Sequence, residues 1–321
     1  MSEIVQVDDY DKAIAMPAFR TIATVDAPPD QDDIRDALLA IHDLFLEHFR
    51  DDAVFAALAS PRGTGGRLVK ATKKKREQCR AVIEEGLESK RGVRYYGTDE
   101  TPLEAPHLPF LSLARDMEPE GEWCTTIEVS VPYDHPDVMQ LAEHLDTILR
   151  KLPLMEGYQG YGWQVSPVGC LDHRWLPSTL IQRYPAALLG EYPRFILLQY
   201  YDKYFAERFE DYDTGISDVG WRTYVGAPFV DRLGDPAKAE AKGVTVEHLP
   251  NVTVVTAGPA PIWGDTEAGE DLTTMRAAFS YVKPAWATRH TLVRFTIGWD
   301  DTVPAWAKKS EDYLDRLEDN T

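Results

Sequence analysis

The chain has 321 residues, of which 44% are hydrophobic and 11% aromatic, a composition typical of a folded globular protein and not of a disordered one. Its formal net charge of −19 argues against nucleic acid as a partner, because phosphate contacts require Lys and Arg. An acidic balance is typical of many cytosolic proteins that bind nothing by charge, and equally suits a protein that meets a basic partner.

The cysteines and the N-terminus indicate a reducing compartment. Cys79, Cys124 and Cys170 stand far apart and form no CxxC pair, so neither a disulfide framework nor a zinc module is expected. The N-terminus lacks the basic start and apolar stretch of a signal peptide. No apolar run approaches the roughly 20 residues of a membrane span. We therefore expect a cytoplasmic protein.

The first third of the chain predicts a loose arm over 1–16, a strand over 19–25 and an acidic helix over 31–50. The buried face of that helix would comprise Ile34, Leu38, Ile41 and Phe45. The basic segment Lys70–Arg80 is expected to be a solvated helix face that pairs with the acidic helix, with a binding patch as the alternative. The Gly-rich residues 60–66 lack the Gly-Lys-Ser/Thr of a phosphate-binding loop and predict a plain connection.

The middle of the chain predicts a strand, a helix and a returning strand. Residues 96–122 are rich in Pro and turn formers and are expected to be irregular. A strand follows over 123–131, then a helix to about residue 152, then a strand over 158–165. The inward face of the helix would comprise Val138, Leu141, Leu145 and Ile148.

A second strand, helix and strand are predicted towards the C-terminus. The strands are expected over 252–256 and 290–297, and the helix between them would begin at an N-cap provided by Asp265 or Thr266. Its buried face would comprise Leu272, Met275, Phe279 and Val282. These offsets match the first helix, which is compatible with an old duplication but also with the shared helical period.

Aromatic residues dominate 178–184 and 193–209, which we expect to be mostly helical and to form core or part of an interface. An acidic helix over 302–319 closes the chain. It would dock through Trp306, Tyr313, Leu314 and Leu317.

One stretch, over residues 215–287, resembles the type VI immunity family of bacterial proteins. That family shows a G-x-x-W-x-T-x-x-G…LG segment, a Val-rich strand, then P-x-x-GD and a helix. The matching residues here are Gly220, Trp221, Thr223, Gly226, Leu233, Gly234, Pro261, Gly264 and Asp265. The resemblance implies a protein that neutralises a toxic effector of a type VI secretion system.

For the fold we predict the α+β class, with a mixed or mostly antiparallel sheet, helices packed mainly on one face and, as one interpretation, two repeated strand-helix-strand units. Residues 1–115 would form a strand-helix region with the basic segment. Residues 116–321 would form the α+β region that carries the family resemblance, and both parts would make one compact unit.

The sequence offers no positive case for catalysis or for a cofactor. Asp134, His135 and Asp137, with Asp172 and His173 further on, are metal-ligand types without a converging spacing such as HExxH, so helix capping is the favoured interpretation. The carboxylates of 265–271 are interpreted in the same way. No Gly-x-Ser-x-Gly elbow is present. We expect no enzyme, no metal and no cofactor.

Two functions from different classes follow. The first is an immunity protein that occludes the active or substrate-binding site of a secreted effector toxin, for example a nuclease. The alternative is a metal-dependent hydrolase that uses the acidic turns at Asp134 and Asp265. Exposed acids and aromatics near the family stretch are predicted to contact the effector, with a core position as an equal alternative for Trp221 and Trp263. These candidates are Glu210, Asp211, Tyr212, Asp213, Asp218, Trp263, Asp265, Glu267 and Glu270.

Overall fold

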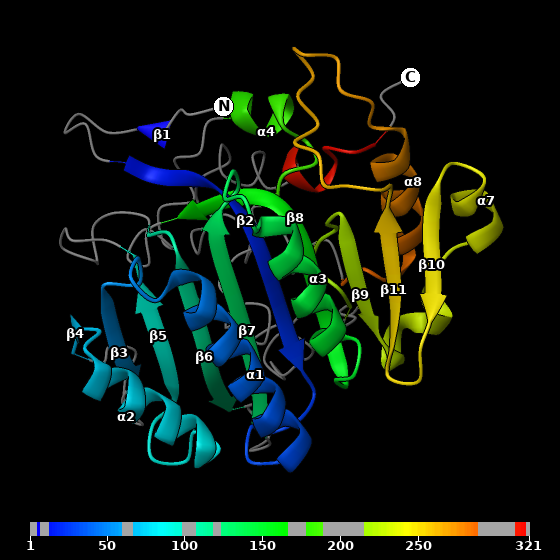
Figure 1. The fold of residues 1–321 in the computed structure, drawn as a ribbon. Helices are drawn as coiled ribbons and strands as arrows, with labels where there is room; N and C mark the ends of the chain where they lie inside the picture. Colours follow the sequence, from blue (N-terminus) through cyan, green and yellow to red (C-terminus); the bar gives the residue numbers. More distant parts are fainter. Residues whose placement is uncertain are drawn as a thin grey trace, which may run out of the picture.

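The computed structural model describes residues 5–6, 13–59, 67–97, 107–117, 123–165, 178–188, 215–287 and 312–318. Within them, eleven strands form one sheet, and every pairing between the named strands is antiparallel (Figure 1). Ten strands follow the order β10-β11-β9-β8-β2-β7-β6-β5-β3-β4, and β1 pairs with β2. The strands are β1 (Val5–Gln6), β2 (Ala13–Val25), β3 (Phe55–Ala59), β4 (Val69–Lys70), β5 (Gly92–Tyr96), β6 (Phe110–Met117), β7 (Trp123–Pro132), β8 (Leu154–Val165), β9 (Arg222–Gly226), β10 (Val244–His248) and β11 (Val252–Ala257).

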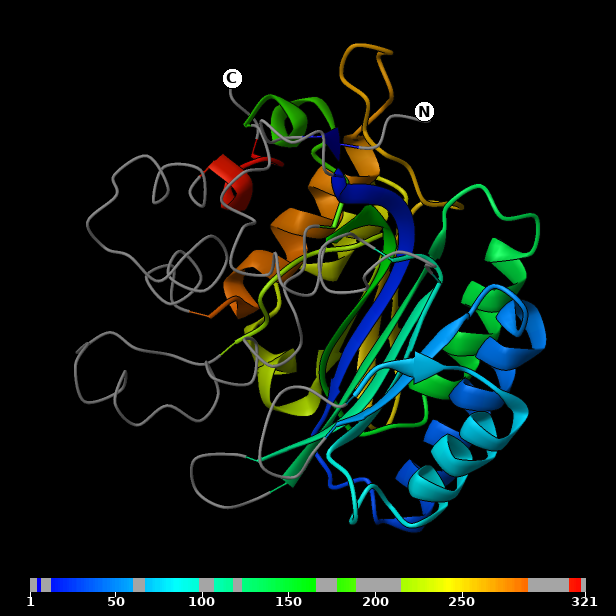
Figure 2. The same ribbon diagram turned by 90° about the vertical axis from the view of Figure 1, so that its left-hand side faces the viewer.

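Helices cover both faces of this sheet, at different places. The helices α1 (Asp32–Phe49), α2 (Lys73–Glu84) and α3 (Val138–Leu149) lie on one face, which we call the α1–α3 face. The helix α8 (Thr273–Val282) packs on the opposite face, the α8 face, against β9 to β11. Figure 2 shows the sheet nearly edge-on, with α8 in orange on the other side from α1, α2 and α3. Shorter helices are α4 (Ser178–Arg183), η3 (Ala227–Arg232), α7 (Pro236–Glu240) and η4 (Lys283–Ala285).

The central strand β2 shows how the two faces differ. It alternates between the faces, so Phe19, Ala23 and Val25 join the main hydrophobic core under α1 and α3. On the α8 face the same strand carries Arg20, which forms a buried ion pair with Glu128 of β7 at 2.9 Å. One face is therefore an ordinary apolar core, whereas the middle of the other is lined with buried polar side chains.

The amphipathic helices are confirmed. In α1 the residues Ile34, Leu38, Ile41 and Phe45 are buried, and in α8 so are Met275, Phe279 and Val282. In α3 the residues Val138, Leu141 and Leu145 are buried, while Ile148 is partly buried and packs against the core. The predicted pairing of the basic segment with the acidic helix is also confirmed, because Arg80 of α2 lies 3.3 Å from Asp43 of α1.

Three local predictions were wrong. The stretch expected to be irregular contains β6, which pairs with β5 on one side and β7 on the other. The helix α8 begins at Thr273, and not next to Asp265, because residues 265–271 form a loop of their own. The arm expected over residues 1–16 includes β1 and the start of β2, both of them paired.

The first predicted strand-helix-strand unit is β7–α3–β8. Both strands pair antiparallel with β2, so they run parallel to each other with β2 between them. The return strand of the second unit, predicted over 290–297, lies outside the described residues, as do 60–66 and 193–209. The predicted α+β class with a largely antiparallel sheet is confirmed.

Candidate functional site

The loop between β11 and α8 is anchored by Trp263. The side chain of Trp263 stacks on Tyr161 of β8, with ring centroids 5.1 Å apart and planes at 15°. The rings of Tyr133, Trp163 and Tyr184 surround it, with centroids 5.4–6.0 Å from that of Trp263. We call these five rings the aromatic cluster. Offset and edge-to-face pairs of this kind add to the stabilisation from burial, so the loop is fixed at this point.

Arg183 of α4 holds the next residues of the loop. Its guanidinium donates two hydrogen bonds of 3.1 Å to the two carboxylate oxygens of Asp265. It also reaches Glu267 at 2.7 Å. The paired guanidinium lowers the pKa of Asp265, with further help from the backbone N–H groups of Ala268 and Glu267. Bidentate pairs of this type fix orientation as well as adding energy.

Backbone contacts close the loop further. Thr266 N–H donates to the carbonyl of Arg183 at 2.9 Å, and Asp265 N–H donates to Glu270 Oε2 at 2.9 Å. Gly264 has φ +72°, and a Cβ at this position would lie 2.7 Å from Leu272 Cδ2. Glycine is therefore required by both the backbone conformation and the close approach. The loop is a pre-formed structure.

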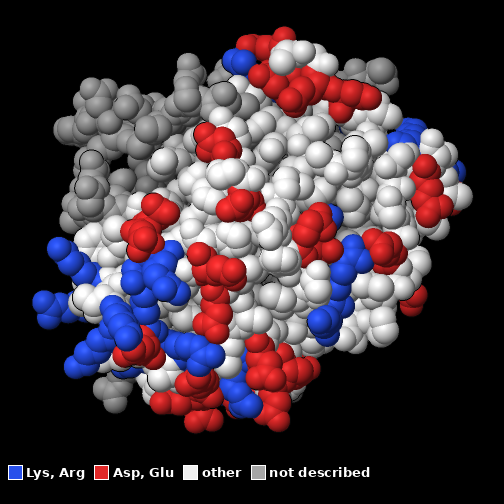
Figure 3. Space-filling view, viewed as in Figure 1, with Lys and Arg blue, Asp and Glu red and all other residues white. Residues whose placement is uncertain are grey.

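Exposed carboxylates cover this pre-formed loop. Glu267, Glu270 and Asp271 are exposed, and Asp265 is half-buried. Figure 3 shows acidic side chains gathered at the top of this view, above the α1–α3 face, while Lys and Arg gather at the lower left over α2. We call residues 265–271 the acidic loop. Four of its seven residues, Asp265, Glu267, Glu270 and Asp271, carry a carboxylate.

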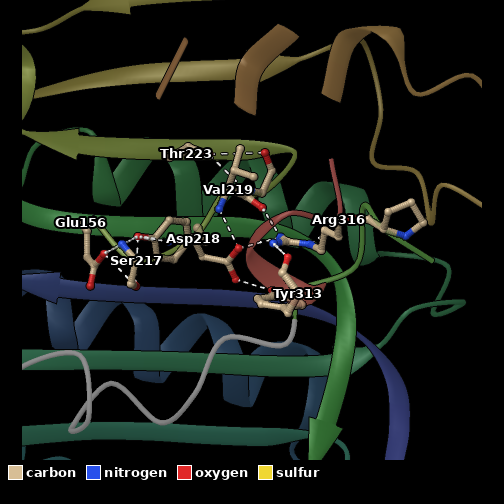
Figure 4. Close-up of polar contacts among 10 residues, drawn as sticks. Glu156, Ser217, Asp218, Val219, Thr223, Tyr313 and Arg316 are labelled. Carbon is tan, nitrogen blue, oxygen red and sulfur yellow. Dashed lines mark hydrogen bonds and ion pairs between the residues drawn. The ribbon is translucent and has the colours of Figure 1, made fainter. Parts of the chain in front are cut away.

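A second polar cluster lies buried on the α8 face and ties the C-terminal segment to the sheet (Figure 4). Arg316 donates to Asp218 Oδ1 at 2.7 Å, and Tyr313 donates to Asp218 Oδ2 at 2.6 Å. Arg316 also donates to the carbonyl of Pro185 at 2.9 Å. Since the side chains of Arg316 and Asp218 are only 1% and 4% exposed, this ion pair is structural.

Glu156 belongs to the same cluster but has no cation among its described contacts. Its Oε2 accepts hydrogen bonds from Ser217 N–H at 2.8 Å, from Ser217 Oγ at 3.0 Å and from the hydroxyl of Tyr158. Burial raises its pKa to about 7, against the effect of these donors. Within the described residues its Oε1 has no hydrogen-bond partner. Glu156 is therefore a buried carboxyl that titrates near neutral pH.

A third polar cluster joins the end of α3 to β9 and β10. Arg150 makes a two-pronged contact with Glu247, both hydrogen bonds being 2.9 Å, and donates to Asp146 at 2.6 Å. Tyr224 donates to Asp146 at 2.6 Å, which satisfies this nearly buried carboxylate. The cluster fastens α3 to the sheet, with Asp146 and Tyr224 buried and Glu247 partly exposed. Its residues were missed in the sequence because their partners lie about 80 to 100 positions away.

Two of the predicted contact residues are buried: the prediction that Asp218 is exposed was wrong, and for Trp263 the alternative of a core position is confirmed. Asp218 is 3% exposed and is held by Arg316 and Tyr313, and Trp263 is 6% exposed inside the aromatic cluster. Glu267 and Glu270 are exposed as expected, and a role for them in binding stays a prediction. The candidates Glu210, Asp211, Tyr212 and Asp213 lie outside the described residues.

The acidic turn before α3 has local structural roles. His135 packs on Phe49 with ring centroids 4.8 Å apart, and its Nδ1 accepts a hydrogen bond from Asp137 N–H at 3.2 Å. Asp137 lies 3.6 Å from His48 of α1. In the part of the chain that the structure describes, no group of three or more His, Cys, Asp or Glu residues could hold a metal ion. Asp172 and His173 lie outside that part.

The fold is shared with a protein of a secretion system. A Pseudomonas aeruginosa T6SS protein, PA0821, superposes with a TM-score of 0.72 over 98% of this chain and 88% of that one, at 17% sequence identity. No family model matches the chain, and no curated protein matches it. At this identity the likeness establishes a common fold. The resemblance to the immunity family therefore stays a prediction.

Among the described residues, no helix is both long enough and apolar enough to cross a membrane.

Proposed function

We propose that this protein is a cytoplasmic immunity protein that binds a cognate effector of a type VI secretion system and blocks its active or substrate-binding site. We also propose that it acts by binding alone and not as an enzyme. Support comes from the fold shared with a T6SS protein over nearly the whole chain, and from the family resemblance of residues 215–287.

The main structural support for this function is that the acidic loop is exposed and already ordered. Exposed carboxylates at Glu267 and Glu270 stand on a backbone that Arg183, Trp263 and Gly264 already fix. A surface that is ordered before binding loses little conformational freedom when a partner docks. Its charge complements a basic surface, and opposite charges accelerate the encounter and select the partner.

A nuclease effector is the partner class that this charge suits best. An enzyme that cuts nucleic acid needs Lys and Arg along its substrate groove to contact the phosphates. The acidic loop would pair with those cations and cover the groove, so that substrate is excluded without any chemistry on the part of the immunity protein. The net charge of −19 would strengthen the long-range attraction.

The first experiment is a pull-down of the tagged, full-length protein from its native bacterium. We expect a stoichiometric partner that stops growth when it is expressed alone and that is silent when this protein is co-expressed. Absence of any partner, together with turnover of a substrate on addition of divalent metal ions, would contradict the proposal and favour a hydrolase.

The contribution of the acidic loop to effector binding is tested with variants that remove its negative charges but keep the size of the side chains. The double variant E267Q/E270Q retains hydrogen-bond acceptors, so the contacts to Arg183 and to the Asp265 backbone can persist. Two exposed ion pairs with the effector would be lost, which corresponds to about a tenfold weaker Kd at low salt. The matched control is E77Q/E88Q, since Glu77 and Glu88 are exposed on and just after α2. Equal affinities for the two double variants would remove the acidic loop from the interface.

A further inference from the structure

We infer that Tyr161 and Glu270, flanked by Tyr133, form a receiving site for a cationic side chain of the partner, an arginine above all. The inference rests on the proposed function, because it names the chemical group of the effector that the surface beside the acidic loop would recognise.

The aromatic cluster runs from the interior to the surface, and it ends in these two tyrosines. Trp163, Tyr184 and Trp263 are buried, whereas Tyr133 and Tyr161 are only partly buried. The ring of Tyr133 meets that of Tyr161 edge-to-face, with centroids 6.0 Å apart at 87°. Trp263 contacts both rings, stacked on Tyr161 and edge-to-face with Tyr133, so both are held in place and lose little freedom on contact with a partner.

Carboxylates border the same rings. Glu270 belongs to the loop that Trp263 fixes against Tyr161, and its Oε2 accepts a hydrogen bond from the N–H of Asp265, two residues after Trp263. Burial raises the pKa of the Tyr161 phenol first, and Tyr133 and Glu270 add to the rise. Asp134 acts in the same way on Tyr133, again after burial. Both phenols stay neutral, and the carboxylates of Asp134 and Glu270 contribute negative charge near the rings. Such charge repels an anion and attracts a cation.

The molecule already uses this chemistry at the acidic loop. The guanidinium carbon of Arg183 lies 5.0 Å from the centroid of the Tyr184 ring, while its nitrogens bind Asp265 and Glu267. An arginine thus packs on a tyrosine of the cluster and is held by carboxylates of the acidic loop. Tyr161 and Glu270 offer a second ring and a second carboxylate of the same loop to a guanidinium from outside.

Arginine suits this arrangement better than lysine. Its planar guanidinium stacks on aromatic rings and donates to a carboxylate at the same time, and it is less strongly hydrated than an ammonium group. Arginine and tyrosine also dominate the residues that carry binding energy in protein interfaces. The expected preference is therefore for an arginine-rich over a lysine-rich partner surface.

The test needs no knowledge of the effector. A fluorescently labelled hexa-arginine peptide is titrated into the full-length protein and its variants at low and at moderate salt. We expect Y161L and E270Q each to weaken binding about three- to fivefold, and Y161F, which keeps the ring, to leave it unchanged. The E77Q/E88Q variant should also bind as the unchanged protein does, and hexa-lysine should bind more weakly than hexa-arginine.

Equal binding by all variants, or an equal loss with E77Q/E88Q, would overturn the site, because the peptide would then respond only to net charge. E270Q leaves the aromatic cluster untouched and keeps the test valid if Y161L unfolds. The two proposals fail separately. If the peptide binds at this site but the protein has no toxic partner, only the proposed immunity function is refuted. If the effector binds Y161L and E270Q as tightly as the unchanged protein, only the arginine site is refuted.

Discussion

Glu156 and Asp218 are buried carboxyl groups on the α8 face, but only Asp218 has a positively charged partner among the described residues. Asp218 has Arg316 as a counter-ion at 2.7 Å. The described partners of Glu156 are neutral groups of Tyr158 and Ser217, and burial raises its pKa to about 7. The contrast makes each residue suitable for a separate test.

For Glu156 we predict a specific dependence of stability on pH. Its pKa is higher in the folded protein, at about 7, than its ordinary value of 4.5, so the neutral carboxyl favours the fold. This contribution is complete below pH 4.5 and is lost as the pH rises through 7. The variant E156Q cannot ionise, so its Tm should fall less than that of the unchanged protein between pH 5 and pH 8. Parallel Tm curves would show that Glu156 does not titrate in this range.

For Arg316 we predict a large loss of stability. Replacing it with Met leaves Asp218 buried without its counter-ion and removes a donor from the Pro185 carbonyl. Removal of one partner from a buried ion pair typically costs about 3–5 kcal/mol. The control is K283A, which breaks an exposed pair with Glu318 in the same region and should cost less than about 1 kcal/mol. Urea unfolding measures the free energy of unfolding of both variants, and a similar loss of stability in the two would contradict a structural role for the buried pair.

At the scale of residues, sequence patterns predicted the apolar positions and missed the polar partners. Periodicity identifies Leu38 or Phe279 as core, because burial follows the repeat of the helix. Nothing local marks Arg183 as the partner of Asp265, which lies 82 positions later. Asp218 was likewise predicted to be a surface acid, because its partners Tyr313 and Arg316 lie 95 and 98 positions away in the sequence. In the structure it is buried.

The elements differ in how strongly their local sequence determines them. The helices α1, α3 and α8 have clear apolar faces and were predicted. The strand β6 was missed because Pro-rich and turn-forming residues flank it on both sides and its alternation is short. The start of α8 was misplaced because Gly264 and Asp265 look like a helix start. Asp265 does accept hydrogen bonds from Glu267 and Ala268 N–H groups, but these belong to a turn of the acidic loop.

The acidic loop itself yields a matched pair of variants. Gly264 and Gly269 both have positive φ, +72° and +70°, but a Cβ at Gly264 would meet Leu272 at 2.7 Å while one at Gly269 would meet nothing within 4 Å. We therefore expect G264A to destabilise the protein by at least about 1 kcal/mol more than G269A, which suffers only the backbone strain. Equal losses in the free energy of unfolding for G264A and G269A, measured with urea, would mean that the loop does not depend on the close packing of Gly264.

For the whole molecule, the predicted α+β class was correct, but the order of the strands in the sheet could not be predicted from the sequence. The central strand β2 pairs with β7 and β8, 100 or more positions away along the chain, and no local pattern encodes that choice. The placement of α8 on the opposite face follows from the same long-range order. The fold nevertheless brings Trp263, Tyr161 and Arg183 together beside the acidic loop, which the sequence singled out only through its family resemblance.

The central claim is that the protein silences a toxic effector by binding it through the acidic loop. The most direct measurement is the survival of cells that express the co-purified partner together with the unchanged protein, with E267Q/E270Q or with E77Q/E88Q. We predict survival with the unchanged protein and with E77Q/E88Q, and growth arrest with E267Q/E270Q when all three accumulate to the same level. Survival with E267Q/E270Q equal to that with the control would contradict the claim.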